Sequence, residues 1–133
     1  MQSSASWDGT PYKAYPSGPP ELTLLRLKIP ANTQLPWHSH PMPNAAYILS
    51  GELIVEARKG GQVITLTQGQ TLAEMVDRAH RGTTGASRSA SWVWACIHQH
   101  PAARLHAGAA HTNIQRHDCM RELRGHHSST QPL

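Results

Sequence analysis

Two histidines separated by a single residue are the first candidates for chemistry in this chain. His38 and His40 flank one serine, and residues i and i+2 of an extended strand point to the same side. Two imidazoles on one side of a sheet can bind zinc, copper, iron or nickel. The spacing alone is a weak signal: ten histidines give about 0.7 such pairs by chance, and His98 and His100 form a second one.

The residues that follow the first pair distinguish it from the second. Asn44 follows His40 after three residues, and Gly51 follows Asn44 after six. Further along, His80 lies eleven residues after Gly69. This layout resembles the two motifs of the cupin family, G-x5-H-x-H-x3,4-E-x6-G and G-x5-P-x-G-x2-H-x3-N. The resemblance spans roughly residues 20–97.

The resemblance implies a fold and a metal site. The fold is an antiparallel double-sheet jelly-roll β-barrel of the small single-domain cupin type. The site is one divalent metal ion inside the barrel, held by His38, His40 and His80. Manganese, iron, nickel and zinc all fit the resemblance, and the sequence does not choose among them.

The chain departs from both motifs at several positions. Asn32 and Asp77 stand where the motifs have glycine, and Met75 and Thr84 replace the proline and the asparagine of the second motif. Asn44 stands where the first motif has the glutamate that usually completes the metal site. Asn44 offers an amide oxygen without charge, so we regard it as a candidate residue of the substrate pocket. Its alternative role is to cap a turn.

Glu74 can restore the missing carboxylate. It is the one charged residue in the apolar segment 72–76, which we predict to be a strand, and a buried carboxylate needs a metal or a charged partner. We therefore predict Glu74 as a fourth metal ligand or as the catalytic base. The alternatives are a surface position at the barrel rim or a salt bridge to Arg78 or Arg81. Likewise, the histidine pair can be a polar edge and His80 a loop residue.

Alternating polar and apolar residues predict the strands that position these side chains. Leu25, Leu27 and Ile29 alternate with charged residues, as in a half-buried strand. Trp92 and Trp94 share one face of the last strand and are expected in the core. Lys59-Gly60-Gly61 predicts a hairpin turn. The expected strands are 22–29, 45–49, 52–58, 63–67, 71–76 and 90–97.

The composition divides the chain into three parts. Residues 1–20 are predicted to be an extended arm, residues 21–100 the barrel, and residues 101–133 a histidine- and arginine-rich tail that is poorly structured or forms a short helix near 113–124. The arm carries Trp7, Tyr12 and Tyr15, so we expect it to pack on a surface. Covering the sheet edge of a second copy is one such role, and a homodimer is therefore expected.

Charge and hydropathy exclude several partners. The formal net charge is +4 and no cluster of basic residues exists, so nucleic-acid binding is not expected. No apolar segment has the length of a membrane span, and the N-terminus lacks the pattern of a signal peptide. We therefore expect a cytoplasmic protein that has no membrane partner.

Two functions are compatible with this pattern. The first is a metal-dependent enzyme of the dioxygenase, isomerase or lyase type that acts on a small molecule, because a three-histidine site leaves coordination positions open. The second is a non-catalytic module that binds a small ligand or a metal. The sequence contains no phosphate-binding loop or nucleophile elbow, so any chemistry is expected to depend on the metal.

Overall fold

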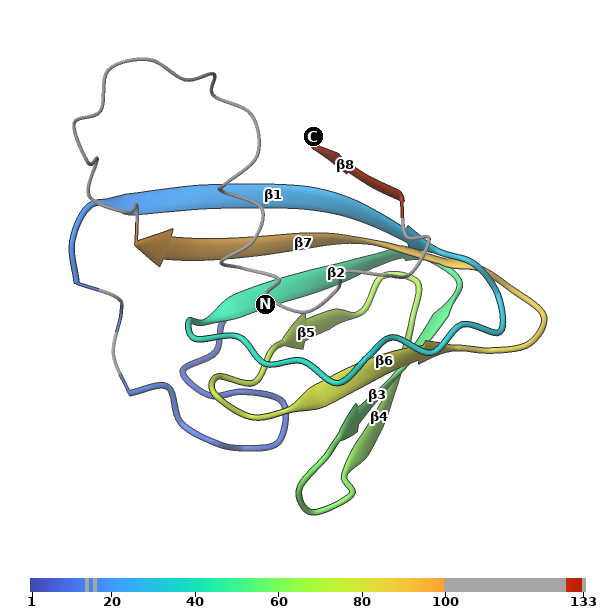
Figure 1. Cartoon of the computed structure of the whole chain (residues 1–133), viewed down its shortest axis with the longest axis horizontal. Helices are drawn as coiled ribbons and strands as arrows, with labels where there is room; N and C mark the ends of the chain where they lie inside the picture. The colour runs from blue at the N-terminus through green and yellow to red at the C-terminus, as the bar shows by residue number, and fades with distance from the viewer. Residues whose placement is uncertain (14, 16, 100–128, 133) are drawn as a thin grey trace.

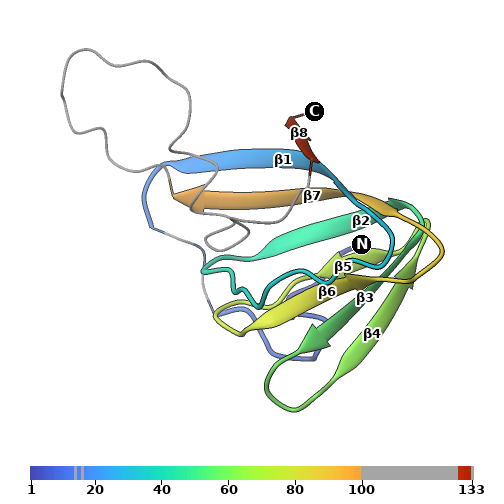
Figure 2. The same cartoon turned by 45° about the vertical axis from the view of Figure 1, so that its right-hand side comes forward.

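The structure is a two-layered arrangement of antiparallel strands (Figures 1 and 2). The computed structural model describes residues 1–13, 15, 17–99 and 129–132, and these contain strands and no helix. One sheet has the order β5-β2-β7-β1-β8 and the other β4-β3-β6. This confirms the predicted all-β double-sheet jelly roll. The strands are β1 (Pro20–Ile29), β2 (Asn44–Ser50), β3 (Glu52–Ala57), β4 (Val63–Thr67), β5 (Thr71–Ala73), β6 (His80–Thr84), β7 (Ala90–Gln99) and β8 (Ser129–Pro132).

The core lies between the two sheets and follows from the alternation of apolar residues. Leu25 and Leu27 of β1 are buried, and they pair with Trp94 and Trp92 of β7. Directly paired residues of antiparallel strands point to the same face, so these four side chains face inward together. Each contributes about 1.5–3 kcal/mol through burial. The prediction that both tryptophans are in the core is confirmed.

Two substituted glycine positions keep the conformation that glycine would adopt. Asn32 has φ +53° and Asp77 has φ +54°, and both stand where the resemblance led us to expect glycine. Asn and Asp are the non-glycine residues that best tolerate the left-handed region. These two departures from the motifs therefore leave the turns before His38 and His80 intact. The predicted hairpin turn is also present, with positive φ at Gly60 and Gly61.

The strands near the candidate site differ from the prediction in two places. β5 ends at Ala73 rather than at residue 76, so Glu74 lies just after the strand. Ala73, Glu74 and Met75 are all buried, which breaks the alternation of a strand. β6 was not predicted, because its inward positions include His80 and Gly82 instead of large apolar residues.

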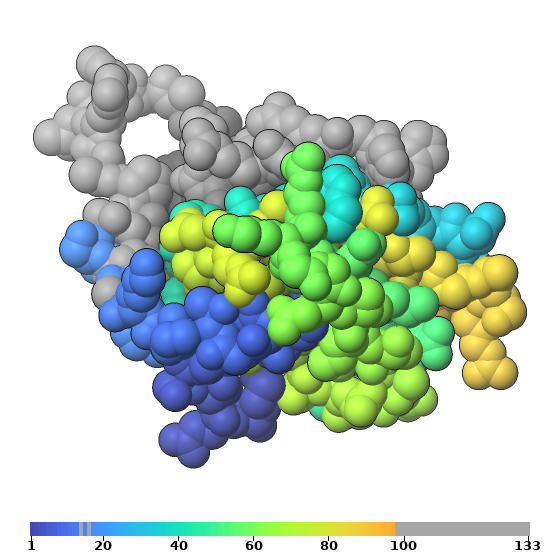
Figure 3. Space-filling model, turned by 90° about the horizontal axis from the view of Figure 1, so that it is seen from below, coloured from blue at the N-terminus to red at the C-terminus, as the bar shows by residue number. Residues whose placement is uncertain are grey.

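The N-terminal arm lies on its own chain. Figure 3 shows the blue N-terminal residues directly against the yellow-green and yellow residues of the β5–β6 region. Trp7 packs against the hydrophobic core, and its main-chain N–H donates a hydrogen bond to Ala73. Tyr15, in contrast, is exposed. Tyr12 also contacts its own chain, because its hydroxyl donates a hydrogen bond to the main-chain oxygen of Glu74. The expected contact of the arm with a second copy stays a prediction.

The end of the chain adds an element that was not predicted. β8 pairs with β1 in antiparallel register, although it lies in the segment that we expected to be a tail. The helix predicted near 113–124 and His100 lie outside the described residues, as does the side chain of His98. Within the described part of the chain, no helix is long and apolar enough to span a membrane.

Candidate metal centre

Backbone pairing brings the histidine pair beside the third histidine. His38 and His80 exchange two main-chain hydrogen bonds, of 3.0 and 2.9 Å, and form an isolated antiparallel bridge. Two residues on, His40 forms a parallel bridge with Val76 and accepts a 2.8 Å hydrogen bond from the N–H of Asp77. The segment that carries the histidine pair is therefore held against the segment from Val76 to His80.

Four predicted ligands converge on one point inside the barrel. One ligand atom from each of His38, His40, Glu74 and His80 lies within 4.8 Å of the others. Glu74 Oε2 is 2.9 Å from His40 Nε2 and 3.1 Å from His80 Nε2. All four side chains are buried: His38 is 9% exposed, Glu74 8%, and His40 and His80 2% each. A polar cluster buried this deeply needs an internal partner for each group, and the convergence of the four groups provides a place for a cation.

Main-chain carbonyls set the orientation of two of the imidazoles. The Nδ1 atom of His38 is 3.0 Å from the oxygen of Pro36, and Nδ1 of His80 is 2.9 Å from the oxygen of Arg78. A carbonyl oxygen only accepts, so each Nδ1 carries the proton. The other ring nitrogen, Nε2, is then the atom of each of these two rings that can serve as a metal ligand.

The electrostatics favour a neutral His38 and an ionised Glu74. Burial, together with the charges of His80 and His40, lowers the pKa of His38 to about 4. Burial opposes ionisation of Glu74, but hydrogen bonds and the charges of His40 and His80 outweigh it and hold the pKa of Glu74 below its usual range. Burial also acts to lower the pKa of His80, yet its hydrogen bond to Glu74 raises the pKa overall. Neutral imidazole and carboxylate are the forms that bind metals.

The alternative partners of Glu74 are occupied elsewhere. Arg78 pairs with Asp8 of the N-terminal arm, and Arg81 pairs with Glu56 of β3. Glu74 therefore lies neither at an exposed rim nor in an arginine salt bridge. In the same way, His80 begins β6 and is not a loop residue.

Asn44 lies close to the cluster but outside it. It is buried at the start of β2, and its main-chain oxygen accepts a 3.0 Å hydrogen bond from the N–H of Glu74. Its side-chain Nδ2 donates to Met42 at 3.5 Å. Its Oδ1 is buried and has no hydrogen-bond partner among the described residues. An acceptor in this state is costly to bury, which agrees with a role in contacting a ligand and leaves that role a proposal.

Sequence reasoning missed three residues around the cluster. The ring of Trp94 lies 5.4 Å from that of His40, between centroids. Tyr12 donates a 2.8 Å hydrogen bond to the main-chain oxygen of Glu74, and Asp8 pairs with Arg78. The aromatic character of the arm indicated packing, but no pattern in the sequence links position 8 or 12 to position 74 or 78.

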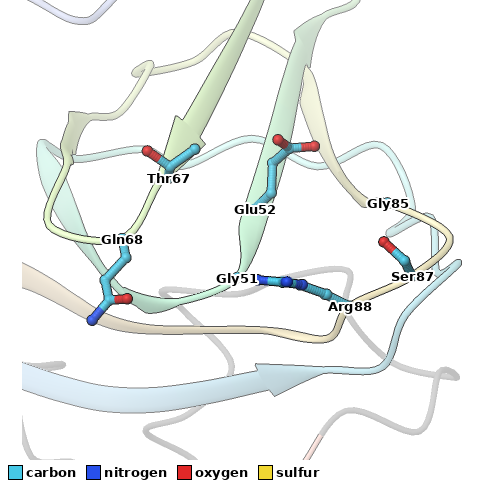
Figure 4. A pocket seen from close by; sticks show the side chains of 7 residues that line it. All are labelled: Gly51, Glu52, Thr67, Gln68, Gly85, Ser87 and Arg88. Atoms are coloured by element: carbon cyan, nitrogen blue, oxygen red, sulfur yellow. The ribbon is translucent and has the colours of Figure 1, made fainter.

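A separate polar pocket lies away from the four converging residues. It has a volume of about 410 Å³ and is lined by the ends of β3 and β4 and by the segment after β6. Figure 4 shows Glu52 and Arg88 among its lining side chains. Its lining includes none of the three histidines and does not include Glu74. We therefore do not assign this pocket to the candidate metal centre.

Comparison with solved structures shows the same fold in distant proteins. The polyketide cyclase RemF from Streptomyces resistomycificus is 15% identical with a TM-score of 0.52, over 62% of this chain and 63% of the cyclase. BH2720 from Bacillus halodurans is 13% identical with a TM-score of 0.51, over 60% and 65% of the two chains. Iron(II) HppE is 18% identical with a TM-score of 0.50, over 56% and 41%. The chain thus spans less than two thirds of each of these three proteins.

Comparison of sequences identifies the family. No curated protein sequence matches the chain. A family model described as a cupin domain matches residues 25–96, which is more than half of the chain and includes the whole candidate centre. The motifs, the two-sheet fold and this match agree, and the chain therefore belongs to the cupin family.

Proposed function

We propose that this cupin binds one divalent metal ion through His38, His40, His80 and Glu74. The observation that carries the proposal is the convergence of four potential ligand atoms within 4.8 Å in the barrel interior. The charges are also suitable, since the set offers three imidazoles and one carboxylate. A divalent cation at this point would balance the charge of Glu74, whose Oε2 lies 2.9 Å from Nε2 of His40 and 3.1 Å from Nε2 of His80.

The donor set suits a first-row transition metal. Imidazole and carboxylate together are typical ligands of zinc, iron and manganese, whereas the absence of thiolates from the set disfavours soft ions. Structures of HppE with iron(II) and with cobalt(II) show that a protein of this fold accommodates divalent ions. With all four ligands engaged, a six-coordinate metal keeps open positions, but a tetrahedral zinc does not.

We further propose that the bound metal serves an enzymatic reaction on a small molecule. A metal in this site would supply Lewis acidity to a substrate oxygen. Glu74 is ionised and lies at the centre, so it either completes the ligand set or accepts a proton from the substrate. Asn44 is proposed to hydrogen-bond the substrate through Oδ1, which has no other partner among the described residues.

The second candidate function is a non-catalytic metal- or ligand-binding module. The low exposure of all four residues, at most 9%, favours it, because a reacting substrate needs a route to the metal. The state of coordination distinguishes the two functions. Cobalt(II)-loaded protein titrated with azide changes its visible absorption if a coordination position is open, and keeps its spectrum if the site is closed.

Metal content tests the proposal itself. The full chain is stripped with a chelator, reloaded separately with manganese, iron, nickel and zinc, and subjected to elemental analysis. The double variant His38→Ala/His80→Ala gives the background from the five histidines in residues 101–133. We expect the parent to bind about one ion more than this variant. Equal metal content in the two proteins would exclude the proposed site.

A homodimer remains part of the proposal. Leu22, Leu24, Tyr47 and Ile97 are exposed, and the strand registers place them on the outer face of the five-stranded sheet. An apolar sheet face of this kind commonly marks an interaction surface. Light scattering of the full chain measures the mass, and a monomeric mass at micromolar concentration would exclude the dimer.

A further inference from the structure

The first residues of the chain form a closed loop rather than a simple extended arm. We call residues 4–12 the N-terminal loop. An isolated bridge between Ala5 and Pro11 closes it, and the N–H of Tyr12 donates a 2.9 Å hydrogen bond to the oxygen of Ser4. Gly9, at φ +85°, makes the turn at its tip. The loop therefore has an internal structure of its own.

A buried carboxylate organises this loop. The side chain of Asp8 is fully buried, and it accepts hydrogen bonds from the hydroxyl of Ser6 and from both the N–H and the hydroxyl of Thr10. Its negative charge is balanced by Arg78, which also donates a 2.6 Å hydrogen bond to the Thr10 hydroxyl. The Arg78 side chain is partly exposed, but that of Asp8 is not. A buried carboxylate that loses its charged partner is strongly destabilised, so Asp8 depends on Arg78.

The N-terminal loop is attached to residues 73–78, a short segment that contains Glu74 and leads directly to His80. Each attachment joins positions more than 60 residues apart in sequence. They are the hydrogen bond from the Trp7 N–H to the Ala73 oxygen at 2.9 Å, that from the Tyr12 hydroxyl to the Glu74 oxygen at 2.8 Å, and the Asp8–Arg78 ion pair.

Two of these attachments act on the backbone that orients the metal-centre side chains. The N–H of Glu74 donates a hydrogen bond to the main-chain oxygen of Asn44, and its own main-chain oxygen accepts one from the Tyr12 hydroxyl. Hydrogen bonds therefore hold the backbone of Glu74 on both sides. Arg78 is held through its side chain by the loop, and its main-chain oxygen accepts the Nδ1 proton of His80. Outer partners of this kind fix the direction of a ligand.

We propose that the N-terminal loop is a positioning element of the metal centre, with Tyr12 and Asp8 as its positioning residues. This inference rests on the proposed function, because it concerns the affinity of that same site for a metal. Tyr12 fixes the backbone of Glu74, and Asp8 fixes Arg78 and thereby the carbonyl that orients His80. Neither Tyr12 nor Asp8 is one of the four proposed ligands, so each acts through another residue.

A pair of tyrosine variants tests this proposal in the full chain. Tyr12→Phe removes only the hydroxyl that bonds Glu74, and Tyr15→Phe is the matched control because Tyr15 is 76% exposed. Cobalt(II) is titrated into parent, both variants and His38→Ala/His80→Ala, which supplies the background. The readouts are the dissociation constant, the visible absorption spectrum of bound cobalt(II), and the melting temperature in chelator.

We expect Tyr12→Phe to weaken cobalt(II) binding about 10-fold, as outer-shell changes do, and to shift the cobalt(II) spectrum, with Tyr15→Phe unchanged. Asp8→Asn should weaken binding in the same direction. Parental affinity and spectrum in Tyr12→Phe would overturn the positioning role while leaving the metal site in place. A lower melting temperature in chelator with an unchanged spectrum would overturn it too, and would leave Tyr12 as a stabilising contact. A parent that binds no more cobalt than the background variant would exclude both the metal site and this inference.

Discussion

Replacing Glu74 by glutamine tests whether this residue serves as a metal ligand or only stabilises the fold. The substitution keeps the size of the side chain and removes its charge. In the present structure Oε2 of Glu74 is 2.9 Å from His40 and 3.1 Å from His80, so both contacts are direct. Changes to the outer partners of metal ligands cost about 10–100-fold in affinity. A carboxylate that is itself within the ligand set should cost at least about 100-fold, or about 2.7 kcal/mol.

The same substitution should have little effect on the protein without metal. Burying an ionised carboxylate carries a desolvation cost of several kcal/mol, which its partners offset. Whichever amide atom of glutamine takes the position of Oε2 can still bond both imidazoles, because an amide oxygen can accept two hydrogen bonds and an NH2 group can donate two. We therefore expect the free energy of unfolding in chelator to change by less than about 1 kcal/mol.

Zinc titration and urea denaturation measure these two effects independently. Glu74→Gln is compared with the parent, and His38→Ala/His80→Ala gives the background binding. The reasoning is refuted if Glu74→Gln binds zinc as tightly as the parent. It is also refuted if the variant loses several kcal/mol of stability in chelator, because Glu74 would then be needed for folding rather than for the metal.

Three further predictions concern the fold and its pH dependence. His38, whose pKa is lowered to about 4 from 6.5, binds fewer protons folded than unfolded between these pH values. The contribution of His38 to the free energy of unfolding in chelator should therefore fall by up to about 3 kcal/mol as the pH drops from 6.5 to 4. Urea denaturation at each pH measures it as the difference between the parent and His38→Gln, and parallel pH profiles of the two proteins would contradict it. Gly51→Ala places a Cβ 2.2 Å from the main-chain oxygen of Ser89 at φ +79° and should cost more than about 2 kcal/mol. Gly60→Ala, at φ +90° with no atom within 4 Å, should cost only about 1 kcal/mol, and equal losses in the two variants would contradict the clash. Trp94→Phe should leave a cavity in the core and lower stability by about 2 kcal/mol, measured by thermal unfolding; an unchanged melting temperature would contradict that packing.

The sequence was sufficient to predict most of the barrel and the grouping of the four candidate ligands. Along β1 the buried residues Leu25, Leu27 and Ile29 alternate with polar or exposed positions, and they pair with Trp94, Trp92 and Ala90 of β7, which are also buried. This alternation is visible in the sequence and marks the inward face. The strand β6 was missed because the candidate ligand His80 and Gly82 occupy its inward positions. When polar or small residues of a site take the inward positions of a strand, the alternating apolar pattern that would predict the strand is lost.

The contacts around the site could not be predicted from the sequence. The N-terminal loop reaches Glu74 and Arg78 across more than 60 residues, and a single Asp or Tyr carries no periodic signal. The loss of the usual glutamate at position 44 was visible in the sequence. Only the fold shows that Glu74 lies beside this position, since its N–H is bonded to the main-chain oxygen of Asn44.

Anomalous diffraction from crystals loaded with zinc tests the central claim most directly. Data collected at the zinc edge locate the ion independently of any assumption about its ligands. We expect one strong peak inside the barrel, about 2.0–2.2 Å from an imidazole nitrogen of each of His38, His40 and His80 and from a carboxylate oxygen of Glu74. No peak among these four side chains in crystals soaked with excess zinc would contradict the account.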